Sequence, residues 1–371
     1  MVPALPSKKK DFLQKPIKQF EPTKVQTVAE LMDAYKEISF QGRNLGTALQ
    51  VWENALMDPD RPTIILGVAG SLQAGGQRKV LRDLIRYNLV DVVVTVGSQP
   101  YQDLYAARGY DFWRASPDVD DLELRSHMLD RLYDTIVDED KFRETDDYLG
   151  SLVAKLDPTK TYTTREVMRF FGDHFAKDQD SWVAEAARTS TPIFVPTIHD
   201  SSIGIGMVQN YVKAKAARKP YPKLDMIRDA YELSQVKYKS KKTAIVYLGG
   251  GVPKNYIQQT EVISEVLGHD AGGHNYAVQL TMDMPVWGAL SGCTFKEAQS
   301  WGKIAKDADF VQAHVDITVG LPLLTTALYQ KRAAWAGRKR LSFQYDGDEL
   351  TLEMQGTPGA KPKKAAKTPA R

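Results

Sequence analysis

The fold is decided by residues 63–98, which read TIILGVAGSLQAGGQRKVLRDLIRYNLVDVVVTVGS. Two short runs within it, residues 63–68 and 91–96, are apolar at nearly every position, and a helical pattern over residues 77–88 lies between them. Continuous apolar runs are typical of parallel strands that are covered on both faces, and the helix between them supplies the right-handed crossover. This stretch therefore predicts a strand–helix–strand unit of a parallel sheet.

Four more apolar runs along the chain extend this unit. They lie at residues 192–197, 244–248, 276–280 and 312–317. Helical patterns follow the fourth and the sixth run, at residues 256–267 and 321–335. Strands that alternate with helices predict an α/β fold, here a doubly wound, mostly parallel six-stranded Rossmann-like sheet.

Two further segments fall outside this alternation. Residues 105–190 are mostly helical in pattern, with LELRSHMLDRLYDTI and TREVMRFFGDHF, and predict a helical insertion between the second and third strands. Residues 341–354 alternate apolar and polar side chains around Asp346-Gly347, which predicts a small C-terminal hairpin. The predicted organisation is an N-terminal leader (1–47), a main domain (48–337), a peripheral hairpin (338–356) and a disordered basic tail (357–371).

The composition excludes several classes of protein. The chain has 371 residues, of which 43% are hydrophobic and 26% charged, and it contains a single cysteine, Cys293. One cysteine excludes a disulfide framework and fits a reducing cytoplasm, while no apolar run is long enough to span a membrane. The tail carries five of the positive charges, so the rest of the chain is near neutral and shows no nucleic-acid footprint. We expect a cytoplasmic protein with no membrane or nucleic-acid partner.

Small and acidic residues follow the predicted strands. In a doubly wound sheet, ligands bind beyond the carboxyl ends of the strands, where glycines let backbone amides approach phosphates and acids can bind ribose hydroxyls. The pattern therefore favours a nucleotide site, although GVAGSLQAGG (67–76) and GGGVPKN (249–255) are too irregular for a standard dehydrogenase fingerprint. The residues at these strand ends are Gly70-Ser71, Gly97-Ser98, Asp200, Gly249–Gly251, Asp283 and Asp316.

Residues 297–304, EAQSWGKI, together with LGGGVPK (248–254) and NLVDVVVT (88–95), resemble deoxyhypusine synthase, and the resemblance runs from about Ala48 to Tyr329. It implies an NAD-dependent transferase that oxidises a polyamine such as spermidine. The aminobutyl arm then passes as an imine through an enzyme lysine to an amine acceptor. The resemblance gives this lysine role to Lys303 and implies a homotetramer. An imine forms from the neutral amine, a form that burial against an indole such as that of Trp301 favours.

The resemblance also implies the remaining site residues. The NAD contacts would come from Gly70, Ser71, Leu72, Gln73, Ala74, Thr95, Val96, Gly97, Asp200, Gly249, Gly250, Met282, Asp283, Asp316 and Ile317. The substrate contacts would come from Glu297, Trp301, Asn255, Ser291, Tyr101 and Gln102. A separate motif, GHDAGGH (268–274), fits no strong zinc signature, so we expect no metal.

The chain departs from the family pattern in the polyamine pocket. Acids and a histidine of the family are replaced by Tyr101, Gln102, Ile205, Asn255, Trp287 and Leu290. Since a buried ammonium without a carboxylate costs several kcal/mol, the departures point to a different amine or a different pose. The acceptor could be a protein lysine, or a small diamine such as putrescine, which would give homospermidine. A non-catalytic protein that binds NAD or a polyamine is a third reading.

Two local features near Lys303 leave alternatives open. Glu297 lies three residues after Thr294, which fits a helix capping box as well as a contact with the amine substrate. On a continuous helix Lys303 and Trp301 would point in directions about 200° apart. A common pocket therefore requires either a break at Gly302 or a substrate that reaches around.

Overall fold

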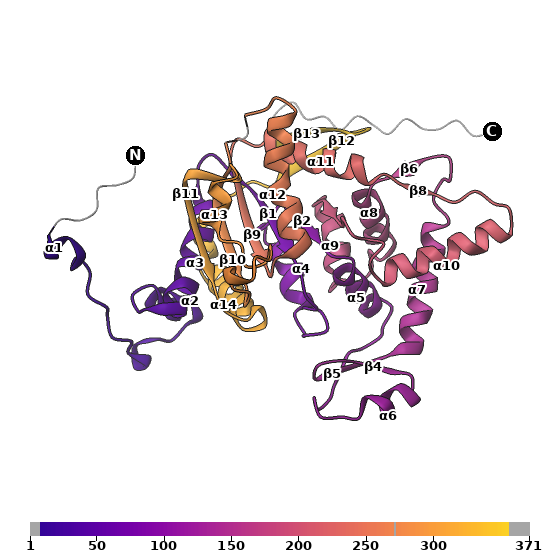
Figure 1. The fold of residues 1–371 in the computed structure, drawn as a ribbon, viewed down its shortest axis with the longest axis horizontal. Coiled ribbons are helices and arrows are strands. Elements are labelled where there is room, and N and C mark those ends of the chain that lie inside the picture. Colours follow the sequence, from indigo (N-terminus) through magenta and orange to yellow (C-terminus); the bar gives the residue numbers. More distant parts are fainter. Residues whose placement is uncertain (1–7, 271, 356–371) are drawn as a thin grey trace.

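Six parallel strands form the central sheet of the computed structural model, which describes residues 8–270 and 272–355, and helices cover both faces (Figure 1). The order is β11–β10–β9–β1–β2–β7, and each neighbouring pair is parallel. The strands are β1 (Thr63–Val68), β2 (Val92–Thr95), β7 (Ile193–Phe194), β9 (Thr243–Leu248), β10 (His274–Leu280) and β11 (Ile304–Ala313). The predicted doubly wound α/β fold is confirmed.

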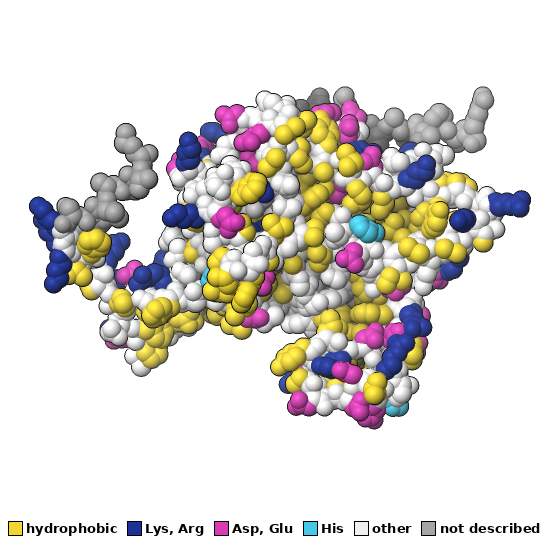
Figure 2. All heavy atoms as spheres, viewed as in Figure 1, with side chains coloured by type: hydrophobic (Ala, Val, Ile, Leu, Met, Phe, Trp, Pro, Cys, Tyr) yellow, Lys and Arg dark blue, Asp and Glu magenta, His cyan; other side chains and the backbone are white. Residues whose placement is uncertain are grey.

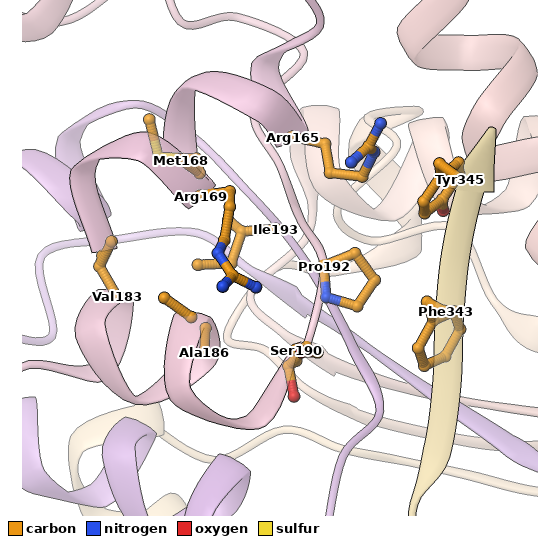
Figure 3. Close-up of a pocket in the computed structure, with 12 residues that line it drawn as sticks. Arg165, Met168, Arg169, Val183, Ala186, Ser190, Pro192, Ile193, Phe343 and Tyr345 are labelled. Atoms are coloured by element: carbon orange, nitrogen blue, oxygen red, sulfur yellow. The ribbon is translucent and has the colours of Figure 1, made fainter. Parts of the chain in front are cut away.

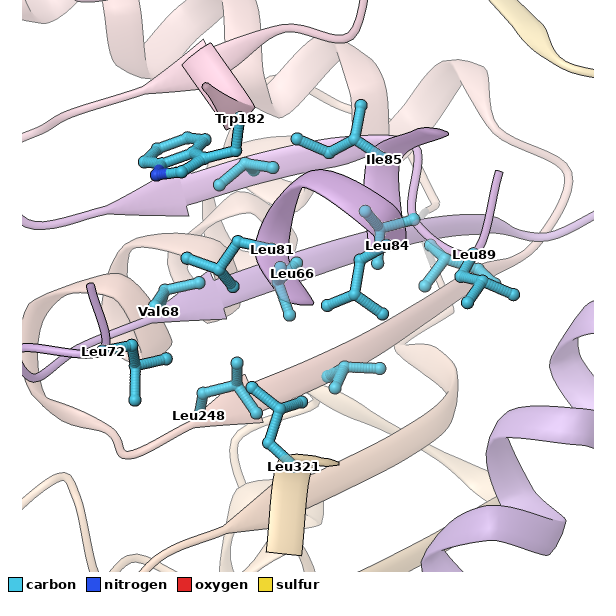
Figure 4. Close-up of a cluster of buried hydrophobic side chains, with 14 of the residues drawn as sticks. Leu66, Val68, Leu72, Leu81, Leu84, Ile85, Leu89, Trp182, Leu248 and Leu321 are labelled. Carbon is cyan, nitrogen blue, oxygen red and sulfur yellow. The ribbon is translucent and has the colours of Figure 1, made fainter. Parts of the chain in front are cut away.

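The central strand β1 supplies side chains to two separate hydrophobic cores. Ile64 and Leu66 face one core, and Ile65 between them faces the other, as expected for side chains that alternate across a strand. The first core is covered by α3 (Phe40–Met57), α4 (Arg78–Arg86) and α14 (Ile317–Gln330), and Figure 4 shows leucines of α4 and α14 beside side chains of the strands on this one face of the sheet. The second is covered by α11 (Met226–Lys239), α12 (Gly251–Val266) and α13 (Phe295–Gln299). Burial on both faces explains why the strands read as continuous apolar runs.

The sixth strand differs from its predicted position. The prediction was residues 312–317, whereas β11 runs from Ile304 to Ala313. This strand lies at the edge of the sheet and exposes Lys306 and Asp307, so much of it lacks an apolar run. Asp316 is therefore not part of the strand: it is the N-cap of α14, and its carboxylate accepts a hydrogen bond of 2.8 Å from the Thr318 amide.

The insertion is helical in part. It contains α6 (Asp121–Ser126), α7 (Glu139–Val153), α8 (Thr164–His174) and α9 (Trp182–Thr189). It also contains a three-stranded antiparallel sheet of β3 (Trp113–Arg114), β4 (Leu129–Leu132) and β5 (Thr135–Asp138), which lies at the foot of α7 in Figure 1. The helix predicted over residues 122–136 is wrong beyond Ser126, because Met128 and Tyr133 take left-handed backbone angles that turn the chain.

Helix α10 (Ser202–Ala216) packs closely along α7 of the insertion. A Cβ atom on Gly206 would lie 1.8 Å from the Asp146 carbonyl oxygen, and one on Gly150 would lie 2.0 Å from the Gly206 carbonyl oxygen. Glycine at both positions is therefore required for the two helices to approach this closely. The outer face of α10 exposes the apolar side chains of Ile205, Val208, Tyr211 and Val212. Figure 2 shows hydrophobic side chains on the arm that this helix forms.

The hairpin predicted near the C-terminus is confirmed as β12 (Leu341–Asp346) and β13 (Glu349–Met354), with Leu350 in the second core. The predicted boundary between residues 47 and 48 falls inside α3, and α2 (Val28–Tyr35) packs against α3 and α14. The predicted tail, residues 357–371, lies outside the described residues.

The remaining elements are α1 (Lys9–Phe12), η1 (Pro22–Lys24), α5 (Ser98–Ala107), β6 (Thr161–Tyr162), β8 (Lys223–Leu224), η2 (Pro285–Trp287) and η3 (Arg332–Trp335). No described helix combines the length and the apolar character needed to cross a bilayer.

Candidate active site

The residues predicted to bind NAD lie in the loops at the carboxyl edge of the sheet. Backbone hydrogen bonds join these loops: Ala69 donates to Leu248 (2.9 Å), Gly249 to Leu280 (2.9 Å) and Thr281 to Ala313 (3.1 Å). The ends of β1, β9, β10 and β11 are thereby fixed next to one another. The structure places the predicted cofactor residues of these four loops on one continuous edge.

The loop after β1 is compact and leaves one polar side chain without a partner. Its backbone closes on itself through bonds from Gly75 to Ser71 (3.1 Å) and from Gln77 to Leu72 (2.8 Å). Gln102 of α5 clamps it, donating to the Ser71 hydroxyl (3.2 Å) and accepting from the Ala74 amide (3.3 Å). Gln73 is buried, and neither atom of its side-chain amide finds a partner among the described residues. A buried amide with free donors and acceptors fits a polar ligand at this edge.

The glycines after β9 allow a second close approach. Gly249 has a φ of +80°, which favours glycine, and a Cβ atom on Gly250 would lie 2.4 Å from the Cα of Ser291. The Ser291 hydroxyl accepts a hydrogen bond of 3.0 Å from the Gly251 amide, the first residue of α12. Ser291 therefore caps α12 and holds residues 285–293 against the end of β9.

The other predicted cofactor residues occupy the same edge. Thr95 is buried and its hydroxyl donates to the Val68 carbonyl (3.1 Å), so it joins β1 to β2. Gly97 begins α5 beside the Ser201 side chain, which a Cβ atom would approach to 2.3 Å. Asp200 and Asp316 are exposed and available to a ligand, Val96 and Ile317 are half-buried, and Met282 and Asp283 are exposed after β10. Glycine-lined backbone, the free Gln73 amide and these carboxylates fit a dinucleotide cofactor.

A cavity of about 220 Å³ lies between α12, α13 and the loop after β10, and Lys303 lines it. The other lining residues are Gln258, Pro285, Gly288, Ala289, Leu290, Cys293, Glu297, Ala298 and Trp301. Lys303 is half-buried, and its Nζ lies 5.6 Å from the centroid of the Trp301 ring, a cation–π distance. The structure thus brings three predicted residues, Lys303, Trp301 and Glu297, into one cavity.

The break at Gly302 creates this arrangement. Helix α13 ends at Gln299, Gly302 takes a φ of +70°, and the Lys303 amide donates back to the Ala298 carbonyl (3.1 Å). The Lys303 carbonyl then accepts from the His274 amide (3.1 Å) as β11 begins. The break therefore turns Lys303 and Trp301 toward the same cavity, which a continuous helix would not do. Trp301 itself is 66% exposed and lies at the rim of the cavity, so it buries Lys303 only in part.

Glu297 has a different position from the glutamates of two complete capping boxes in the chain. In α2 and α8 the third residue, Glu30 or Glu166, bonds back to the amide of the cap. In α13 the Thr294 hydroxyl accepts from the Glu297 amide (3.0 Å), and Glu297 lines the cavity. The Thr294 cap is confirmed, and the Glu297 carboxylate is available to a ligand.

Lys254 of α12 is buried next to the cavity and contacts Cys293, one of its lining residues. The side chain is 1% exposed, and its Nζ donates to the Gln279 side-chain oxygen (2.9 Å) and to the Cys293 carbonyl (2.6 Å). Burial lowers its pKa to about 8, against the opposing influence of Cys293, Glu297 and Asp283. Burial destabilises the charged form of a lysine that is held by neutral oxygens alone, so this lysine loses its proton more easily than an exposed one.

Two residues of the cavity were missed or set aside by the sequence analysis. Gln258 is 2% exposed, lines the cavity and has a side-chain nitrogen with no partner among the described residues. Its position three residues after Asn255 on the same helix face was the available signal. Cys293, to which the sequence analysis assigned no site role, is half-buried and lines the cavity, and burial raises the pKa of its thiol.

Four predicted substrate residues lie outside the lining of this cavity. Tyr101 is buried in α5, where its hydroxyl donates to the Phe142 carbonyl (3.0 Å), and Gln102 holds the loop after β1. Asn255 is half-buried beside Lys254 in α12, and Ser291 caps that helix. Among the described residues, no group of three or more His, Cys, Asp and Glu side chains is arranged to hold a metal ion.

A smaller cavity of about 110 Å³ lies where the hairpin meets α8 and the start of β7 (Figure 3). Its most buried cation, Arg165, stacks 3.8 Å over the Tyr345 ring and donates to the Glu232 carboxylate (2.6 Å). These contacts attach the hairpin to the insertion, so we interpret this cavity as a packing junction.

The fold and the site define a Rossmann-like α/β protein whose ligand-binding edge adjoins a lysine-bearing cavity. A family model described as deoxyhypusine synthase matches residues 30–328, and the chain belongs to the deoxyhypusine synthase family. Membership places it among transferases of the deoxyhypusine-synthase type.

Curated relatives agree with this assignment, and a solved structure shares the fold. The chain is 41% identical over 333 residues to "Probable deoxyhypusine synthase 2" of Methanosarcina mazei, covering 88% of this chain and 93% of the relative. It is 36% identical over 341 residues to "Deoxyhypusine synthase-like protein" of Coxiella burnetii, covering 90% and 94%. A solved Entamoeba histolytica structure assigned to deoxyhypusine synthase superposes with a TM-score of 0.60 at 17% identity, covering 85% of this chain and 97% of that one, which shows the shared fold.

Proposed function

We propose that the protein is an NAD-dependent aminobutyl transferase that acts on a polyamine such as spermidine through an imine on Lys303. The observation that carries the proposal is the break at Gly302, which directs Lys303 into a cavity with Glu297 and away from a solvated helix face. A surface lysine with no chemical role would not need a left-handed glycine to turn it inward. Support also comes from membership of the deoxyhypusine synthase family.

The cofactor, when bound at the carboxyl edge, would accept a hydride from the polyamine carbon next to the secondary nitrogen and later return it. The neutral Lys303 amine attacks that oxidised carbon, forming a new C–N bond, and the original C–N bond breaks to release the diamine portion. An acceptor amine then attacks the same carbon and frees Lys303. Glu297 lines the same cavity and would take and return the proton at the attacking nitrogen.

A small diamine is a second candidate for the acceptor. Glu297 is the one carboxylate among the described residues that line the cavity, and much of the remaining wall is apolar, with Pro285, Leu290 and Trp301. Acids of the family are replaced in this chain, by Gln102 and Leu290 among others, which favours a different amine or a different pose. We therefore propose transfer to a diamine such as putrescine as the second candidate, beside transfer to a protein lysine.

A trapping experiment tests the proposal. The protein is incubated with NAD and spermidine, reduced with borohydride and weighed intact, and the modified residue is mapped by peptide mass spectrometry. We expect an aminobutyl mass gain at Lys303, no gain in Lys303→Arg, and an unchanged gain in Lys296→Arg, a matched exposed lysine on α13. NAD binding without an adduct from any polyamine would instead indicate a non-catalytic binding protein.

The acceptor and the assembly need separate measurements. Supplying putrescine or a protein acceptor to the loaded enzyme distinguishes homospermidine formation from modification of a protein lysine. From the family resemblance we also propose a cytoplasmic homotetramer. A stable, fully active monomer in light scattering would contradict that assembly.

A further inference from the structure

A larger cavity lies at the opposite, amino edge of the sheet. It measures about 560 Å³ and lies between the ends of α4 and α14 and the short helix η3. Asn88 and Leu89, which line it, come just before β2, so it is separated from the Lys303 cavity by the length of the strands. The lining residues are Arg86, Tyr87, Asn88, Leu89, Tyr329, Gln330, Arg332, Ala333, Trp335, Ala336 and Arg338.

One wall of this cavity is aromatic. The rings of Tyr87 and Tyr329 lie 5.0 Å apart between centroids with an interplanar angle of 59°, and they are 43% and 40% exposed. The guanidinium of Arg332 lies 4.3 Å from the Tyr329 ring centroid. Aromatic side chains that remain this exposed offer a surface on which a planar ring can stack.

The charges around the cavity are strongly unbalanced. Three arginines line it, Arg86, Arg332 and Arg338, and the described lining includes no carboxylate. Arg86 pairs with Glu185 outside the lining (2.8 Å), a carboxylate that it shares with Arg188. Arg332 donates to the Tyr329 carbonyl (2.9 Å) and forms no ion pair with any carboxylate of the described chain. Such a surplus of guanidinium groups favours an anion.

The buried residues next to the lining also carry more positive than negative charge. Arg338 shares the single carboxylate of Asp91 with Arg61, each at 2.7 Å. Burial lowers the pKa of Arg338, and the neighbouring charges of Arg61 and Arg340 lower it further. An anion in the cavity would relieve this repulsion.

Two buried polar atoms of the lining have unused hydrogen-bonding capacity. The Arg338 side chain is 3% exposed, yet its Nε finds no acceptor among the described residues. The Asn88 side-chain oxygen is likewise buried without a donor, although its nitrogen donates to the Arg338 carbonyl (3.0 Å). Buried polar groups are normally paired, so a free donor and a free acceptor beside one cavity indicate a ligand with both kinds of group.

We infer that this cavity binds a planar aromatic anion of about mononucleotide size, with its ring on the Tyr87–Tyr329 wall and its anionic group on the arginines. A polyamine is excluded here because the lining cations would repel it. The site goes beyond the proposed transferase function and does not depend on it.

Isothermal titration calorimetry of the full chain with AMP tests the inference, with saturating NAD present to occupy the predicted cofactor site. We expect one AMP per chain under these conditions, weakened about tenfold or more in Arg332→Ala and in Tyr87→Leu. Adenosine and inorganic phosphate, each supplying half of the ligand, should bind at least about tenfold more weakly. Lys303→Arg and the matched exposed control Arg218→Ala should bind AMP normally.

Three results would overturn the inference. The AMP heat could disappear when NAD is saturating, which would assign it to the carboxyl edge. It could persist unchanged in both cavity variants, provided that circular dichroism shows them folded. Phosphate could bind as tightly as AMP, which would remove the aromatic requirement. A chain that binds AMP but forms no adduct on Lys303 would contradict the transferase proposal and leave this site standing.

Discussion

The two edges of the central sheet each bury an ionised side chain, but they compensate its charge differently. At the amino edge, Asp91 accepts from Arg61 (2.7 Å), Arg338 (2.7 Å) and the Ile64 amide (2.8 Å). At the carboxyl edge, Lys254 donates to two neutral oxygens, of Gln279 and Cys293. Positive charges therefore compensate Asp91, whereas Lys254 is held by neutral oxygen acceptors alone.

Both pKa values are lowered, which favours the charged form of Asp91 and disfavours the charged form of Lys254. Burial alone would raise the pKa of Asp91, but Arg338 and Arg61 hold it well below its usual range. Burial lowers the pKa of Lys254 to about 8, and the distant acids offset this in part. The amino edge therefore gains stability from its buried ion, whereas the carboxyl edge keeps a costly one. Cost without stabilisation is typical of functional sites.

The largest effect that we expect is on chemistry at the carboxyl edge. Lys303→Arg keeps a cation in the cavity but removes the imine-forming amine, so turnover should fall by about 10⁴-fold or more. Because Lys303 is half-buried and its backbone bonds remain, the melting temperature should move by no more than about 2 °C. Polyamine turnover and thermal unfolding are measured on the same preparation, with Lys296→Arg as control. Retained turnover in Lys303→Arg would show that Lys303 does not form the imine and that the carboxyl edge has no catalytic lysine at this position.

The second prediction concerns stability at the amino edge. Asp91→Asn leaves Arg338 and Arg61 buried without a counter-charge, which should lower the free energy of unfolding by about 3–5 kcal/mol. Because the folded pKa of Asp91 is depressed, its contribution is present above its unfolded pKa and is lost as the pH falls below about 4. Urea unfolding at pH 7 and at pH 3–4 should therefore show a smaller difference between variant and parent at the acid end.

A control for this variant is Asp60→Asn, since the Asp60 side chain is 30% exposed and pairs with Lys241 and Lys242 near the surface. It should be destabilised much less. An equal loss of stability in the two variants would show that burial does not set the value of these ion pairs.

The third prediction concerns the cost of the charged lysine at the carboxyl edge. The folded pKa of Lys254 is below its unfolded value, so the parent should gain about 2–3 kcal/mol of stability as the pH rises from 7 to 10.5, and lose it as the pH falls through 8. Lys254→Met has no titrating group at this position, so it should lack this component. The two oxygens that Lys254 contacts keep a donor, because Gln312 donates to Gln279 (2.7 Å) and to the Cys293 carbonyl (3.0 Å). The measured quantity is the stability of the parent minus that of the variant across this pH range. Lys296→Met is the exposed control, and parallel curves would contradict the cost assigned to Lys254.

The predictable parts of the fold are those that local sequence controls. Buried strands such as β1 and β9 read as apolar runs because helices cover both of their faces. The edge strand β11 escaped detection along most of its length because one side faces solvent and carries charges. The small antiparallel sheet of the insertion was misread because leucines at helical spacing occur on either side of left-handed turns.

The site was predictable to a similar degree. The motif predicted Lys303 as a site residue and left open whether the chain breaks at Gly302, where the structure has a break. Gln258 was not found, since its unpartnered nitrogen becomes visible when α12 is packed against residues 285–293. The amino-edge cavity was inaccessible to sequence analysis, because its Arg338–Asp91 pair joins residues about 250 positions apart.

The smallest expected effect separates the two roles of the α13 cap. Thr294→Ala removes the hydroxyl that accepts from the Glu297 amide and should cost about 1 kcal/mol, while Thr294→Ser should restore most of it. Glu297→Gln keeps that amide and the cap, so it should leave stability nearly unchanged and lower turnover. Unfolding and kinetics of the three variants are compared. If Glu297→Gln lost stability as Thr294→Ala does and kept its turnover, Glu297 would be a capping residue, and the described lining of the Lys303 cavity would offer no other carboxylate for the proton transfer.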